Sequence, residues 1–202
     1  MRLRYNPFDI FTSSATPAGL YARRNWLHGQ TAATLKADFQ ETVIGLLSSQ
    51  AIDGSWDHSV VKTVHRLFGL HLTVRSQSEP IKKALGWLLD QTLATFPRRR
   101  VVSGEHLTPG ALRGQQFTGG CSGFFMTGAT LFLASIFGRE NDSAILEIYR
   151  RLNLLNLRNK GRWCGCSCSN NILRAFAYAN QHNCPPLQDG LISAGFTLKL
   201  AE

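Results

Sequence analysis

The chain has 202 residues, and its 22 lysines and arginines outnumber its 13 aspartates and glutamates, which gives a formal net charge of +9. A chain of this length needs no second domain, because one domain of this size buries roughly 70% of its unfolded surface. The longest apolar run, 124–137, is too short to span about 30 Å of hydrocarbon. No apolar segment follows the first arginines, so the sequence predicts a cytoplasmic protein without a signal peptide or a transmembrane segment.

The first 33 residues contain prolines, glycine and a run of hydroxyl side chains, with aromatic residues scattered among them. We expect residues 1–33 to form an extended N-terminal arm with a short helix near 21–27. From Thr34 the apolar residues recur with the spacing of one helical face. These residues are Leu35, Phe39, Val43, Leu46 and Leu47. We therefore predict that a helical domain, 34–202, begins here.

Amphipathic helices alternate with more apolar ones along the rest of the chain. Asp57 is placed to cap the second helix, and Pro80 fits the first turn of the third. Residues 97–120 are rich in arginine, glycine and proline, and such a long irregular segment is usually functional or mobile. The later helices are predicted at 122–137, which should be buried on most sides, at 141–157, from Cys164 or Ser169, and at 190–200. No stretch alternates as a strand does, so the predicted fold class is all-α.

The turn after the first helix carries a recognisable motif. Leu46-Leu47-x-x-Gln50-x-x-x-Gly54-x-Trp56 resembles the Gln-Trp repeat of squalene and other triterpene cyclases, which is related to the Gly-Gly-Phe repeats of protein prenyltransferase β subunits. A weaker copy ends at Gly161-Arg162-Trp163 and lacks the glutamine. The resemblance implies an α/α toroid, in which outer helices surround inner ones and the Gln and Trp pack at the turn between them. The chain would supply a partial ring of about three helical hairpins.

The resemblance also indicates which residues could form a functional site. Triterpene cyclases of the bacterial type use an Asp-x-Asp-Asp acid, and this chain has no two adjacent aspartates, which argues against that chemistry. Protein prenyltransferases hold zinc with an Asp-x-Cys and a His at the starts of successive inner helices. Here Gly119 stands in the place of that Asp, and Cys164 stands about where the His is expected. The candidate zinc ligands are Cys121, Cys164, Cys166 and Cys168, and the alternative is that these are buried thiols.

Other candidate residues have both a functional interpretation and a plainer structural one. Asp57 and His58 lie at the start of an inner helix and are the catalytic candidates, although a core or surface role is the more common explanation of a histidine. Arg98, Arg99 and Arg100 are candidates to bind a diphosphate, and a solvated loop is the alternative. The aromatic residues suited to line an apolar cavity, or to form plain core, are Trp87, Phe124, Phe125, Phe132, Phe137 and Phe176.

Two classes of function remain open. The first is a terpenoid cyclase-like or prenyltransferase-like protein that binds or transforms an isoprenoid or another apolar ligand, and whether it is an enzyme is undecided. The second is a non-enzymatic scaffold or interaction module, which a second copy or a partner completes, or of which this chain is a fragment. The basic groups would also attract diphosphates or acidic lipids. Nucleic acid ranks last, because the arginines are spread over at least four separate segments.

Overall fold

The computed structural model describes residues 6, 8–27, 32–74, 76–96, 122–158, 163 and 169–180. These residues are all-α, as the sequence predicts, and an isolated bridge between Gln50 and Trp56 is their one β-type pairing. No helix among them has the length and apolarity that crossing a membrane requires. The elements are η1 (Asp9–Phe11), α1 (Pro17–Asn25), α2 (Ala32–Leu47), α3 (Val60–Thr73), α4 (Glu79–Thr95), α5 (Ser122–Ile136), α6 (Ser143–Arg158) and α7 (Ser169–Asn180).

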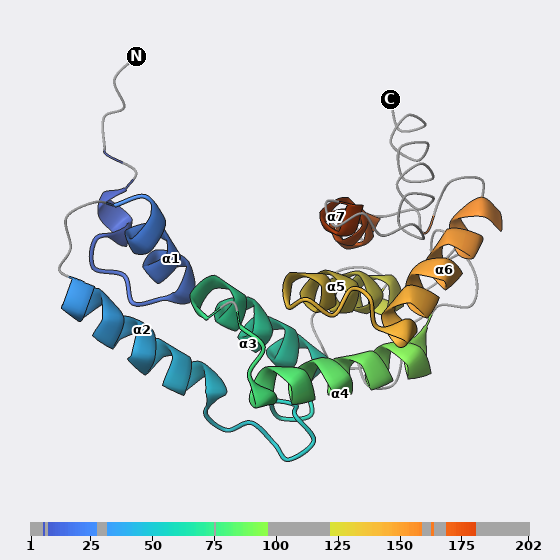
Figure 1. The fold of residues 1–202 in the computed structure, drawn as a ribbon, viewed down its shortest axis with the longest axis horizontal. Helices are drawn as coiled ribbons and strands as arrows, with labels where there is room; N and C mark the ends of the chain where they lie inside the picture. Colours follow the sequence, from blue (N-terminus) through green and yellow to red (C-terminus); the bar gives the residue numbers. More distant parts are fainter. Residues whose placement is uncertain are drawn as a thin grey trace.

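The helices pack in two rows. In one row α1 contacts α3, α3 contacts α5, and α5 contacts α7, while α2, α4 and α6 each pack against members of that row. Figure 1 shows the odd-numbered helices on the inner side of an arc and the even-numbered helices on its outer side. This alternation is what repeated helical hairpins require, because each pair needs neighbours to bury its faces. Over the described residues the arc is open.

The N-terminal segment is more helical than an extended arm. The helix expected near 21–27 runs instead from Pro17 to Asn25, with the Thr16 hydroxyl accepting the Gly19 N–H as its N-cap. Proline at the first position costs no helical hydrogen bond. Leu20 is fully buried, and α1 packs against both α2 and α3. Therefore α1 occupies the inner row, one step before α3.

The start of α3 differs from the prediction. Asp57 and His58 have φ values of 53° and 49°, which is left-handed backbone. The helix therefore begins only after Ser59, whose hydroxyl accepts the Lys62 N–H at 3.3 Å. The prediction that Asp57 caps this helix is wrong, because its carboxylate pairs with the Lys62 ammonium instead.

Helix α5 joins the two hydrophobic clusters of the molecule. One cluster gathers α3, α4 and Trp56 around Met126 and Leu133, and the other gathers α6 and α7 around Phe124 and Leu131. Between residues 123 and 135 of α5, every residue except Phe125 and Phe132 is buried. The prediction that this apolar helix is buried on most sides is confirmed.

The contact between α5 and α7 is unusually close at one residue. A Cβ atom at Gly128 would lie 2.7 Å from the backbone nitrogen of Ile172, which is closer than real contacts allow. Glycine therefore lets the two backbones approach, and the register of α7 on α5 depends on it.

Candidate functional site

The turn between α2 and α3 is held by the glutamine and tryptophan of its motif. The Gln50 Nε2 donates to the Gly54 carbonyl at 2.9 Å and to the Pro80 carbonyl at 2.8 Å. The second bond ties the turn to the first turn of α4. Trp56 is 2% exposed, and its Nε1 donates to the Ser48 carbonyl at 3.0 Å. The motif thus joins three successive helices.

The second copy of the motif repeats part of this arrangement. Trp163 is fully buried, and its Nε1 donates to the Leu152 carbonyl of α6 at 2.8 Å. Its ring stacks on Phe176 of α7 with centroids 5.5 Å apart. Each tryptophan therefore bonds back to a carbonyl in or just after the preceding outer helix. The repeated tryptophan is structural at both places.

Asp53, Ser55 and His58 supply the residue types of a hydrolase triad in the same turn. The Asp53 carboxylate lies 2.9 Å from the His58 Nδ1 and accepts the Ser55 hydroxyl at 2.7 Å. Ser55 also lies 3.4 Å from that same Nδ1. In a working triad the serine and the aspartate bond opposite nitrogens of the imidazole. These three side chains therefore brace the turn and do not form a nucleophilic triad.

The pKa of Asp53 is lowered, first by the Ser55 backbone N–H, and then by the Ser55 hydroxyl and His58. The carboxylate consequently stays ionised as an acceptor of hydrogen bonds. The His58 side chain is 75% exposed. The predicted catalytic role of His58 remains a prediction, and its Nδ1 is hydrogen-bonded to the Asp53 carboxylate.

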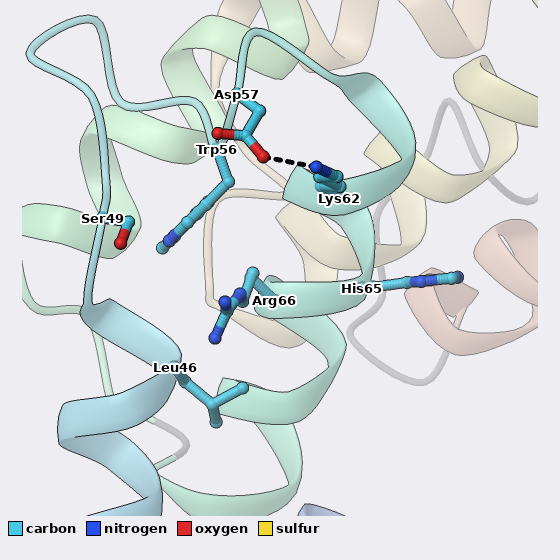
Figure 2. Close-up of a pocket in the computed structure, with 7 residues that line it drawn as sticks. All are labelled: Leu46, Ser49, Trp56, Asp57, Lys62, His65 and Arg66. Atoms are coloured by element: carbon cyan, nitrogen blue, oxygen red, sulfur yellow. Dashed lines mark hydrogen bonds and ion pairs between the residues drawn. The ribbon is translucent and has the colours of Figure 1, made fainter. Parts of the chain in front are cut away.

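Asp57, the other catalytic candidate, lines an open pocket of about 550 Å³ between the end of α2 and the start of α3 (Figure 2). Its carboxylate pairs with Lys62, and that hydrogen bond lowers the pKa of Asp57, which disfavours a general-acid role near neutral pH. The Arg66 Nη1 donates to the Gly45 carbonyl at 2.7 Å. The lining residues are Leu46, Ser49, Trp56, Asp57, Lys62, His65 and Arg66.

The interactions that this pocket can offer a ligand are mainly electrostatic. Figure 2 shows Arg66 below Trp56, the Asp57–Lys62 pair above it, and His65 directed away from both. Lysine and arginine suit carboxylate or phosphate groups. Asp57 and His58 do not converge on a common point, because Asp57 faces Lys62 and His58 faces Asp53.

The other predicted site residues lie outside the described residues. They are Arg98, Arg99, Arg100, Cys121, Cys164, Cys166 and Cys168. Their proposed roles in diphosphate and zinc binding stay predictions. In the described part of the chain, no group of three or more His, Cys, Asp or Glu side chains could hold a metal ion.

Half-buried aromatic rings cross the inner row of helices. Phe68 of α3 lies 5.9 Å from Phe132 of α5, and Phe132 lies 5.7 Å from Tyr178 of α7. The Arg174 guanidinium stands over the Phe132 ring at 5.0 Å. We call Phe68, Phe132 and Tyr178 the aromatic row. It connects three successive inner helices.

On α5 the aromatic row belongs to a stripe of half-buried residues. On α5 the half-buried residues Phe125, Phe132 and Ile136 are seven and four positions apart, so they share one face. The predicted lining residues Phe124, Phe137 and Phe176 are instead buried in the two clusters. Helical spacing alone cannot distinguish the half-buried aromatic residues from the buried ones, because the difference depends on which neighbouring helix covers each face.

Comparison with known proteins identifies no relative. No protein-family model, no curated protein and no solved structure matches this chain.

Proposed function

We propose that this protein is a helical-repeat binding protein that receives an extended apolar ligand, with an isoprenoid chain as the first candidate, along the inner side of its arc. The observation that carries the proposal is the aromatic row. Its rings are half-buried and lie 5.7–5.9 Å apart on α3, α5 and α7. A ligand that crosses these helices would contact ring after ring, and aromatic side chains bury large apolar areas.

The side chains around the described sites favour a binding role over a catalytic one. Asp57 is paired with Lys62, and His58 points to Asp53 at an exposed turn. Neither lies on the α3, α5 or α7 surface that bears the aromatic row. The proposal therefore assigns ligand binding to the row, and it leaves zinc-dependent chemistry to the predicted cysteine ligands.

Binding of a fluorescent polyprenyl alcohol tests the proposal. Replacing Phe132 or Tyr178 by leucine keeps an apolar side chain but removes the ring contacts. We expect each change to weaken binding about two- to tenfold. Phe39→Leu is the matched control, because Phe39 is also half-buried and belongs to α2, where its ring faces the Arg24 guanidinium and not the row. Equal losses in all three variants, or no binding by the unmodified protein, would reject the proposal.

A scaffold role is the second candidate, and exposed leucines on the outer row favour it. Leu157 is 67% exposed and Leu154 is 38% exposed near the end of α6. Such side chains suit a contact that extends the open arc with a second copy or a partner. Light scattering during size-exclusion chromatography distinguishes the candidates. A concentration-dependent dimer that Leu157→Ser dissociates, together with absent probe binding, would place the scaffold role ahead.

A further inference from the structure

A cluster of exposed apolar side chains lies at the N-terminal end of the arc. Trp26, just after α1, contacts the rings of Phe8, Phe11 and Tyr21 edge-on, with centroids 6.5, 6.3 and 5.9 Å away. Ile10 lies in η1, between Phe8 and Phe11 in the sequence. We call these five residues the N-terminal patch. From this patch we infer that the protein docks on an anionic lipid surface.

Exposure sets the N-terminal patch apart from the aromatic row. Ile10 is 75% exposed, Trp26 is 53% exposed and Phe8 is 43% exposed. Ordinary surfaces carry single apolar residues, whereas contiguous exposed ones mark a contact with a partner or a membrane. The three ring contacts of Trp26 connect the η1 segment to the end of α1, and the exposed parts of these side chains face water.

The composition of the patch fits the boundary between lipid and water. Tryptophan and tyrosine are enriched at that boundary because each has an apolar body and a polar edge. The patch is carried by a short 3-10 turn and the adjoining end of α1 (Figure 1). Projecting side chains of this kind can enter a fluid lipid surface without the matching cavity that a protein partner would have to supply.

Charge indicates which lipids are favoured. The whole chain carries a formal net charge of +9, which favours a negatively charged surface over a neutral one. Near the patch, Asp9 accepts a hydrogen bond from Asn6 at 2.7 Å, and the Arg24 guanidinium lies over the Tyr21 ring at 5.9 Å. Among the residues that the structure describes beside the patch, these two opposite charges offset each other. Insertion of the patch into lipid and the long-range attraction of the whole chain to anionic lipid are thus separate contributions to binding.

Sedimentation with vesicles of phosphatidylcholine, with or without phosphatidylserine, tests the inference on the full chain. We expect binding to the vesicles that contain phosphatidylserine and weaker binding at high salt, because salt screens the attraction. Ile10→Ser should lower the partition coefficient about tenfold, since it removes an aliphatic side chain that insertion would bury. Circular dichroism checks that the helices persist.

Two matched controls make the result specific. Ile44→Ser and Ile52→Ser change isoleucines that are 70% and 97% exposed elsewhere, on α2 and in the following turn, and both should leave partitioning within about twofold. Equal losses in these controls would overturn the inference. So would equally strong binding to pure phosphatidylcholine vesicles, or a dimer that Ile10→Ser dissociates without any vesicle binding, which would identify a second copy as the occupant.

Fluorescence gives an independent readout. Trp56 and Trp163 are buried, Trp87 is half-buried, and Trp26 is the exposed tryptophan among the four in the chain. A blue shift on adding vesicles would therefore report mainly on Trp26, and its absence at saturating lipid would contradict insertion. This result does not depend on the proposed ligand, because Phe132→Leu should leave the shift unchanged.

Discussion

At the scale of single residues, Gly54 shows how strictly the Gln-Trp turn is defined. Its φ of +92° is accessible chiefly to glycine, and a Cβ atom there would lie 2.5 Å from the carbonyl carbon and oxygen of Lys83. The turn is therefore pressed against the backbone of α4. The Gln50 amide bridges the same two segments through Pro80.

Gly54→Ala should consequently destabilise the fold. Left-handed strain alone costs about 1–3 kcal/mol, and the clash with Lys83 adds to it. Urea unfolding measures the change. The control is Gly86→Ala, because a Cβ atom at this position of α4 would meet no atom of another described helix within 4 Å. This substitution should stabilise the fold by up to about 1 kcal/mol. Similar effects of the two substitutions would show that the turn does not require glycine.

The lowered pKa of Glu147 predicts how the stability of the fold depends on pH. Hydrogen bonds from Arg150 and then Arg151 lower its pKa from 4.5 to about 2. Because the folded-state pKa lies below the unfolded value, the contribution to stability is complete above about pH 4.5 and is lost as the pH falls toward 2. Glu147→Gln should reduce the loss of stability across this interval. Urea midpoints at several pH values measure it, and an unchanged acid profile would contradict the assignment.

At the scale of elements, helical periodicity predicted most of the helices well. The apolar spacing from Thr34 and the apolar run that became α5 both correspond to observed helices. The start of α3 was misplaced, because left-handed backbone at Asp57 and His58 delays the helix until Ser59 has capped it. The same turn contacts α4 through Gln50 and Gly54, and such contacts between segments are not encoded by local residue preferences.

Gly128 provides the test of helix register. A methyl group at this position would press on the Ile172 nitrogen and displace α7 from α5. Gly128→Ala should destabilise the protein by about 1–3 kcal/mol. If the proposed function holds, it should also weaken binding of the polyprenyl probe, because Tyr178 moves relative to Phe132. The measurements are urea unfolding and probe titration. If stability falls while probe affinity is unchanged, the row does not depend on the α5–α7 register.

At the scale of the whole molecule, the repeated motif predicted hairpins but not how they share their faces. The sequence shows Phe68, Phe132 and Tyr178 as separate residues of three different helices, and only packing brings their rings together. The N-terminal patch was equally hidden, because the sequence does not show that Trp26 gathers the rings of Phe8, Phe11 and Tyr21 around it while about half of its own surface stays exposed. Both surfaces arise from relations between elements.

The position of α5 has a consequence for folding. Repeat proteins with separate interfaces can lose terminal units one at a time, because each repeat contacts only its neighbours. Here Met126 and Leu133 belong to one cluster, while Phe124 and Leu131 belong to the other, and all four lie on α5. The amides of this helix should therefore exchange with solvent only when both halves open together, which makes α5 the cooperative centre of the fold.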